Sequence, residues 1–503
     1  MTRRDALLGM GSAVLLGRAD AQVTPDMVQF RPEIEPLVRL MEITPRERCA
    51  EMLVEQLRRG VSYRQLLAAL FLAAIRNVNP QPPGFALHSV FIIHAAHLLA
   101  MEAPPDSRLL PLFYALDNFK TSQDRDSKQT NGDYVMRPIA GSLPGADRAA
   151  DELKAAMEAW DQERAERAAA GMARHGSAAA AFQLLRRYGA RDYRNIGHKA
   201  IYVANASRTL ETIGWQHAEP VLRSLVLALL DFGKDRKVDG YAFEDQCYLA
   251  NAARVKAGFG KLSASPWTAS DSDPSAVRAL WEAIRSTSPE EACAEAGKRL
   301  VGGTAGANSV WDAVHLSAAE LAMRGAPAAT IQGIHTVSAV NGLHHAYVAC
   351  GDPSLQFLLV LQGVGWVGQF RKLVESRADR QRAFSIMDME PLGEGGPQDR
   401  RIEETFAAVP SKVDEAASRV MKLATDPGSR QAFLSAAVRT TLAKGDEVHF
   451  YKFLAAILED TALIGPQWQP RFLAASVHYM KGPSNAEPIA IKRAREAMRA
   501  LPA

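Results

Sequence analysis

Four histidines follow shortly after a glycine, and they form two pairs with almost the same separation. His88 and His335 are 247 positions apart (335 − 88), and His198 and His449 are 251 apart (449 − 198). Recurrence at one offset is typical of a duplicated unit. Neutral imidazoles bind zinc, iron, copper and manganese. If two copies of the unit pack about a twofold axis, His88, His198, His335 and His449 meet there and form a metal site.

Each of these histidines comes just after a predicted helix break, so we expect it in the first turn of its helix. The helix macrodipole there disfavours imidazolium and keeps the ring neutral, which is the form that binds a metal or polarises a carbonyl group. A structural role is the alternative, since a histidine at a helix start also caps a carbonyl or fills a polar hole, and a duplication copies structural residues as well.

The neighbouring histidines are limited by helical geometry. Residues nine apart differ by about half a turn, so His97 points away from His88, and His344 points away from the first histidine of its own helix. His94 and His97 share a face, which favours a second site. That site would be asymmetric, because Asn341 and His344 take the matching positions in the second half.

Two further histidines have carboxylates nearby. His315 follows Asp312 by three residues and precedes Glu320 by five, which makes it a candidate acid/base, although a lone histidine on an apolar helix is more often a hydrogen-bonded core residue. His217 lies two residues before Glu219, but the second half has no equivalent pair, and we do not expect His217 to be a ligand.

The duplication extends beyond the histidines. Residues 44–51 resemble residues 288–295 at an offset of 244 (288 − 44). Thr44, followed by Pro45 and Glu47, predicts a helix N-cap with a capping box. The matches keep their order along the chain, which indicates a tandem duplication of about 240 residues.

The resulting fold prediction is all-α, because alanine is abundant and the apolar runs have helical length. We expect helical hairpins in series, forming two halves packed with pseudo-twofold symmetry, as one fused bundle or a short solenoid. The predicted boundaries are 22–262 for the first half, 263–276 for a linker and 277–503 for the second half.

Composition excludes several classes of protein. The net charge is only +3 over 503 residues and no long basic run occurs, so no nucleic-acid partner is expected. The four cysteines lie far apart without a Cys-x-x-Cys motif, which argues against a thiolate zinc site. The sequence also has no Walker loop, no Gly-x-Gly-x-x-Gly that follows a predicted strand, no Gly-x-Ser-x-Gly nucleophile elbow and no His-Glu-x-x-His motif.

The first 21 residues predict a cleaved secretion signal. Two arginines precede a short apolar run, and Ala19-Asp20-Ala21 offers a small-x-small cleavage site. The adjacent Arg3 and Arg4 resemble a twin-arginine signal, which would export a folded and often cofactor-loaded protein; a general secretion signal with two arginines in its basic region is the alternative. We expect the mature protein in the periplasm or outside the cell, with no transmembrane segment.

Two of the histidine segments, residues 334–343 and 198–206, resemble the His-led helices of questin oxidase-like proteins. That family is helical, and its name-giving members open anthraquinone rings oxidatively. The resemblance covers these helices and not the loops. It implies an oxidoreductase in which His198 and His335 are the first residues to test.

Together these features predict an exported, His-dependent oxidoreductase that acts on a small organic molecule in a cavity between the halves. The expected cofactor is a transition metal (Fe, Zn, Cu or Mn), and non-covalent haem held by two histidines is the alternative. A non-enzymatic helical-repeat scaffold of the cell envelope is the competing function. The enzyme requires the four leading histidines to converge, whereas the scaffold predicts them scattered along a ridge.

Overall fold

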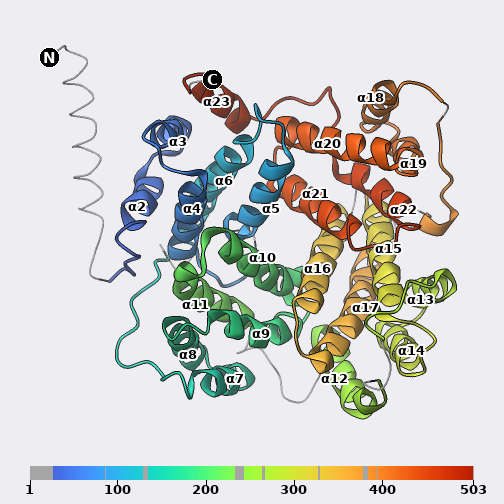
Figure 1. Cartoon of the computed structure of the whole chain (residues 1–503), viewed down its shortest axis with the longest axis horizontal. Helices are drawn as coiled ribbons and strands as arrows, with labels where there is room; N and C mark the ends of the chain where they lie inside the picture. The colour runs from blue at the N-terminus through green and yellow to red at the C-terminus, as the bar shows by residue number, and fades with distance from the viewer. Residues whose placement is uncertain are drawn as a thin grey trace.

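The computed structural model describes residues 26–84, 86–128, 134–232, 243–262, 267–326, 329–377, 383–393 and 395–501. These residues form helices and no strand, so the all-α prediction is confirmed (Figure 1). None of the described helices has the length and apolar character needed to cross a bilayer. The α-helices are α2 (Glu35–Ile43), α3 (Cys49–Arg58), α4 (Tyr63–Asn77), α5 (His88–Glu102), α6 (Leu110–Ser127), α7 (Ala149–Ala159), α8 (Gln162–Arg174), α9 (Ala178–Gly189), α10 (His198–Ile213), α11 (Ala218–Leu229), α12 (Phe243–Leu262), α13 (Pro274–Ser286), α14 (Pro289–Val301), α15 (Ala307–Gly325), α16 (Thr330–Val348), α17 (Pro353–Glu375), α18 (Gln398–Ala408), α19 (Val413–Leu423), α20 (Pro427–Lys444), α21 (Val448–Thr461), α22 (Gln469–Ala474) and α23 (Ile489–Met498).

Four helices form a closed ring at the centre of the fold. α5 packs on α10, α10 on α16, α16 on α21, and α21 on α5. Seven further helices pack directly on this ring: α4 and α6 on α5, α9 and α11 on α10, α15 and α17 on α16, and α20 on α21 (Figure 1). The four leading histidines therefore belong to four helices that touch one another.

The sequence explains why these helices are central. α5 and α16 are apolar nearly all round, and such helices are stable only when they are buried. Gly342 lets α16 approach α10 closely, because a Cβ atom at this position would lie 2.9 Å from the carbonyl oxygen of Ala200. The contact joins a helix of the predicted first half to one of the second.

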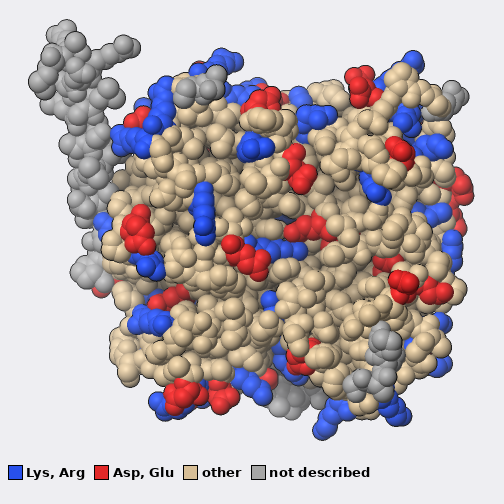
Figure 2. Space-filling model, viewed as in Figure 1, with Lys and Arg blue, Asp and Glu red and all other residues tan. Residues whose placement is uncertain are grey.

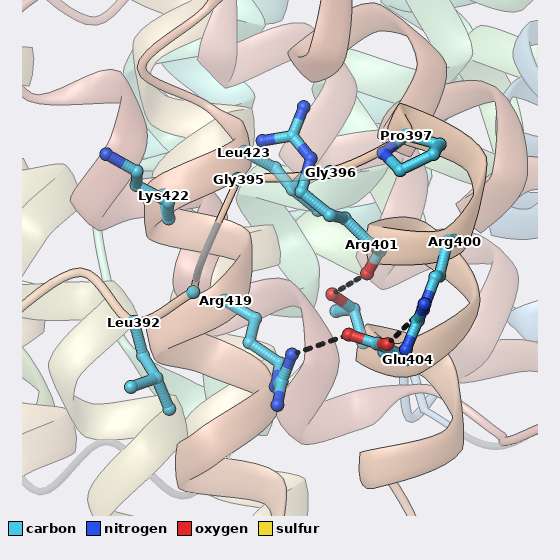
Figure 3. A pocket seen from close by; sticks show the side chains of 12 residues that line it. Leu392, Gly395, Gly396, Pro397, Arg400, Arg401, Glu404, Arg419, Lys422 and Leu423 are labelled. Atoms are coloured by element: carbon cyan, nitrogen blue, oxygen red, sulfur yellow. Dashed lines mark hydrogen bonds and ion pairs between the residues drawn. The ribbon is translucent and has the colours of Figure 1, made fainter.

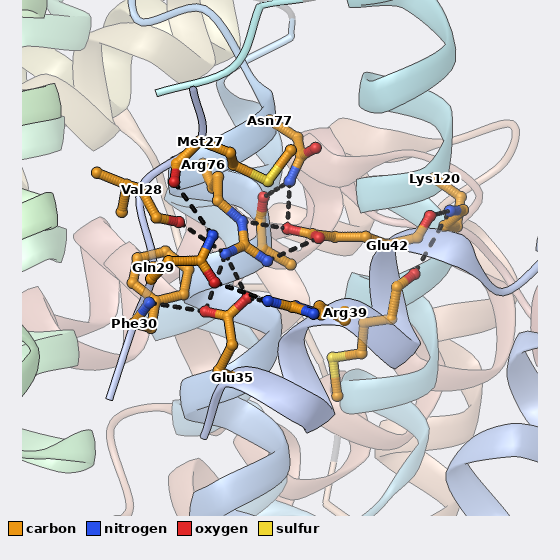
Figure 4. Close-up of polar contacts among 12 residues, drawn as sticks. Met27, Val28, Gln29, Phe30, Glu35, Arg39, Glu42, Arg76, Asn77 and Lys120 are labelled. Atoms are coloured by element: carbon orange, nitrogen blue, oxygen red, sulfur yellow. Dashed lines mark hydrogen bonds and ion pairs between the residues drawn. The ribbon is translucent and has the colours of Figure 1, made fainter. Parts of the chain in front are cut away.

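The segment that leads into α2 is fastened by one buried cation. The Arg76 side chain on α4 is fully buried and pairs with Glu35 at 2.7 Å and with Glu42 at 2.8 Å (Figure 4). The same guanidinium donates to the Val28 carbonyl oxygen at 3.0 Å and faces the Phe30 ring at 4.6 Å. Arg76 thus ties the extended N-terminal segment and α2 to the core.

One detail of the predicted helix starts is wrong. Thr44 is the C-cap of α2, its hydroxyl bonds back to the Leu40 carbonyl oxygen, and α3 begins only at Cys49 after a 3₁₀ turn. The capping box does form in the matching segment, where Ser288 and Glu291 cap α14. The duplication and the domain boundaries stay predictions from the sequence, and the expected secretion signal lies outside the described residues.

Candidate metal centre

Three of the four leading histidines converge. His198 Nε2 lies 3.0 Å from His88 Nε2 and 3.1 Å from His335 Nε2. One potential ligand atom from each ring lies within 4.8 Å of the other two, and all three side chains are buried. His88 and His335 are 110 and 137 positions away from His198 in the sequence, yet both contact it at one place in the core.

The backbone positions these rings differently. His88 and His198 are the first residues of α5 and α10, as predicted, but His335 is the sixth residue of α16, so its expected place in a first turn is wrong. Ahead of His198 the chain turns sharply: Asn195 has φ 56° and Ile196 has φ 47°. The left-handed region is unfavourable for a β-branched residue, so this turn stores strain beside the cluster.

Gly197, with φ 81°, completes this turn and brings α10 against α16. A Cβ atom there would lie 2.6 Å from the Cβ of Ala339, which is closer than real side chains come. Glycine before His198 is therefore required twice, by its backbone conformation and by the close contact of the two helices.

Hydrogen bonds fix the orientation of the rings. His335 Nδ1 lies 2.7 Å from the Ile331 carbonyl oxygen, and since a carbonyl only accepts, this nitrogen carries the proton. His335 Nε2 is then left with a lone pair that faces the cluster. His198 also bonds the backbone of Asn195. A histidine held by Nδ1–H to an oxygen acceptor, with Nε2 directed inward, is typical of metal ligands.

His449 lies beside the three histidines without belonging to the converging group. Its ring centroid is 4.6 Å from that of His88 and 4.8 Å from that of His335. His449 Nδ1 pairs with Glu447 Oε2 at 2.7 Å, and Tyr479 donates to the other carboxylate oxygen. His449 Nε2 is buried and has no hydrogen-bond partner in the described structure, so it is a lone pair next to the centre.

Burial, more than the helix dipole, keeps these rings neutral. It lowers the pKa of His88, His198 and His335 well below the ordinary histidine value, and Lys452 and the neighbouring rings lower these pKa values further. Lys452 is one turn after His449, and burial lowers its own pKa to about 7. Its Nζ has no hydrogen-bond partner within the described part of the chain.

The short distances from His198 Nε2 to the Nε2 atoms of His88 and His335 are poorly explained by hydrogen bonds alone. A neutral imidazole nitrogen carries either one proton or one lone pair, so His198 Nε2 forms at most one good hydrogen bond with its two neighbours. Nitrogens bound to one ion at about 2.0–2.1 Å lie about 3 Å apart when they are adjacent ligands. The two contacts of His198, at 3.0 and 3.1 Å, are therefore of the size that ligands of one metal ion would show.

A second buried polar network lies farther along the same four helices. Arg208 pairs with Glu459 at 3.2 Å, and His94 pairs with the same carboxylate at 2.7 Å. Asn341 accepts from Arg208 at 2.9 Å and donates to Asp460 at 2.8 Å. Burial raises the pKa of Asp460 well above its ordinary value. Burial also acts to raise the pKa of Glu459, but the hydrogen bond from His94 and the charge of Arg208 have the larger combined effect and lower this pKa to about 2.

His315 belongs to this network and is absent from the converging group. His315 Nε2 lies 2.7 Å from His344 Nδ1, and Trp311 stacks on His344 at 4.3 Å. His315 Nδ1 and Asp460 Oδ2 are 3.6 Å apart, and neither has a hydrogen-bond partner among the described residues. His315 as an acid/base thus stays a prediction, with Asp460 as the carboxyl that faces it.

The contacts of His94, His97 and His217 bear on the remaining histidine predictions. His97 lies 3.4 Å from the Tyr63 hydroxyl while His94 turns to the Glu459 carboxylate, so the two do not form the second site predicted for them. His217 lines a surface cavity away from the cluster. Glu219 pairs with Arg174 and leaves His217 without the carboxylate proposed for it.

The surface offers cavities at other places. One of about 190 Å³ lies between α18 and α19 and is lined by several arginines (Figure 3). Glu404 neutralises two of them, Arg400 at 2.9 Å and Arg419 at 3.2 Å. Two further cavities flank His217. Positive and negative side chains are interspersed over the visible face, which is hollowed near its centre (Figure 2).

The sequence held signals for residues that were not predicted. Glu447 stands two positions before His449, and Lys452 three positions after it. Arg208 and Glu459 each follow a leading histidine by ten residues (208 − 198 and 459 − 449), so matched positions form an ion pair. Comparing the two predicted halves position by position would have identified this pair.

Comparisons of the chain with models of protein families, with characterised proteins and with solved structures gave no match. The chemistry of the buried histidines is therefore the basis on which a function is inferred.

Proposed function

We propose that His88, His198 and His335 hold one transition-metal ion and that this ion is the catalytic centre of an oxidoreductase acting on a small organic molecule. The observation that carries the proposal is a pair of Nε2–Nε2 contacts, at 3.0 and 3.1 Å, by which His198 joins His88 and His335 in a buried cluster. The competing scaffold function predicted histidines scattered along a ridge, and three of the four meet instead.

The donor set limits the metal. Three imidazoles and no carboxylate suit iron, copper or zinc, with manganese a weaker fit, and disfavour magnesium and calcium. Structural metal sites are usually closed by four protein ligands, whereas catalytic sites use three and keep a position for substrate or water. His449, held by Glu447, lies beside the three histidines and would act as a fourth ligand or as an acid/base.

Two features support catalysis over a purely structural ion. The strained residues Asn195 and Ile196 adjoin His198, and such strain gathers at functional sites. Lys452 is a buried amine with no hydrogen-bond partner among the described residues, an arrangement that costs stability. The resemblance to questin oxidase-like proteins favours redox chemistry, and the predicted signal favours export of the metal-loaded protein.

Oxygen consumption tests the redox function. The metal-reconstituted protein is offered anthraquinones and hydroquinones, beside a His335→Ala variant and a His217→Ala control. We expect oxygen uptake in the wild type and the control and its loss in His335→Ala. The oxidoreductase proposal would be refuted if the protein binds metal but turns over no redox substrate and the metal never changes its oxidation state. The metal centre would then be structural or hydrolytic.

A further inference from the structure

Two of the four cysteines meet in the core, although they are 46 positions apart in the sequence (293 − 247). Cys247 is on α12 and Cys293 is on α14, and these helices pack together against α17. A Cβ atom on Gly365 of α17 would lie 3.1 Å from the Sγ of each cysteine. The two sulfur atoms are therefore no more than about 6 Å apart, in a space that only glycine leaves open.

The Cys293 thiol is held in place by polar contacts. Asn251 Nδ2 lies 3.4 Å from Cys293 Sγ, and this sulfur lies 3.3 Å from the Leu361 carbonyl oxygen. Cys247 donates a hydrogen bond to the same sulfur. Burial acts to raise the Cys293 pKa, but the bonds from Cys247 and Asn251 outweigh it and lower the pKa below its ordinary value.

The other two cysteines have different surroundings. Cys49 bonds the carbonyl oxygens of Thr44 and Pro45 in its own turn, and Cys350 contacts Asp352. All four are free buried thiols in the structure. Only Cys247 and Cys293 face a second sulfur.

We propose that Cys247 and Cys293 are a disulfide site, which closes when the protein folds in the presence of an oxidant. In this step the Cys293 thiolate attacks a small-molecule disulfide and releases one thiolate. Cys247, after losing its proton, attacks the resulting mixed disulfide, forms the Cys247–Cys293 bond and releases the second thiolate. The protein loses two protons and two electrons, and the small disulfide is reduced to two thiols.

Thiol counting tests the site without any variant. The protein is refolded with glutathione disulfide, then denatured and titrated with and without prior reduction. We expect two thiols before reduction and four after it, and a proteolytic map in which the peptides of Cys247 and Cys293 are linked. Four thiols before reduction, or a linkage that involves Cys49 or Cys350, would overturn the proposal.

Variants add a second readout. Since the bond closes a 46-residue loop (293 − 247), reduction should lower the melting temperature by about 4 °C. Cys247→Ser should abolish this sensitivity to reductant, whereas the control Cys350→Ser should retain it. Equal sensitivity in both variants would contradict the assignment, and if Cys247→Ser fails to fold, Cys293→Ala takes its place. None of these results depends on whether the histidines bind a metal.

Discussion

Lys452 provides a sharp test of the electrostatics around the histidines. Its amine is fully buried without a hydrogen-bond partner in the described structure, and burial lowers its pKa from 10.5 to about 7. A lysine whose folded pKa is depressed binds fewer protons in the folded state than in the unfolded state between these two pH values. The free energy of unfolding therefore rises with pH over this window and is lowest below pH 7.

The size of the effect follows from the two pKa values. At about 1.4 kcal/mol per pH unit, the buried lysine costs the metal-free fold about 5 kcal/mol at pH 6, about 3 kcal/mol at pH 8 and about 1 kcal/mol at pH 10. Lys452→Met keeps the aliphatic stem and removes the charge. We expect it to stabilise the protein by these amounts, less the weak contact between the ammonium group and the Phe91 ring.

Denaturant unfolding of metal-free wild type and Lys452→Met at pH 6, 8 and 10 measures the difference. Lys199→Met is the matched control, because Lys199 is equally buried but pairs with the buried Asp192 at 2.9 Å. Its loss leaves the buried Asp192 carboxylate with only Arg194, whose guanidinium is 3.8 Å away, and should destabilise the fold by about 3 kcal/mol. If Lys452→Met also destabilises, or if its effect is the same at all three pH values, the reasoning about an unpaired amine is wrong.

Three further predictions concern the same core. If His449 is a fourth ligand, Glu447→Gln should weaken metal binding about 10–100-fold, because the amide no longer orients His449 through a charged hydrogen bond, and metal titration measures this; unchanged affinity would exclude His449 as a ligand. Arg76→Met should cost about 3–5 kcal/mol in denaturant unfolding, since Glu35 and Glu42 lose their buried partner, and a cost below about 1 kcal/mol would contradict the anchoring role. The three converging histidines have folded pKa values well below their unfolded value of about 6.5. As the pH is lowered below about 6.5, the unfolding free energy of the metal-free protein should therefore decrease, by up to about 4 kcal/mol per pH unit. An unfolding free energy that does not decrease between pH 6.5 and pH 5 would refute the neutrality of these histidines.

The fold class could be predicted because its signals are local. Apolar runs of helical length such as residues 63–76 became buried helices, and Ser288 with Glu291 capped α14 as its sequence suggests. The N-terminal limit of α3 could not be predicted, because Thr44 caps the end of the preceding helix and a 3₁₀ turn comes before α3 begins. Local capping preferences do not reveal which of two adjacent helices a residue will serve.

The candidate site was predictable in composition and less so in geometry. The offsets between matched histidines indicated which residues to compare, and three of the four meet. The place of His335 within α16 depends on where that helix begins after its break, and the side chain reaches the centre from its second turn. Lys452 and the pair Arg208–Glu459 were not predicted, because their roles arise from contacts between helices that are far apart in the sequence.

The central claim is that the three converging histidines bind one metal ion. Elemental analysis with an absorption spectrum, on purified wild type beside His198→Ala and the control His97→Ala, tests it most directly. We predict close to one transition-metal ion per chain in the wild type and in His97→Ala, and none in a folded His198→Ala. A metal-free wild type that unfolds cooperatively and takes up no iron, copper, zinc or manganese when these are supplied would contradict the claim.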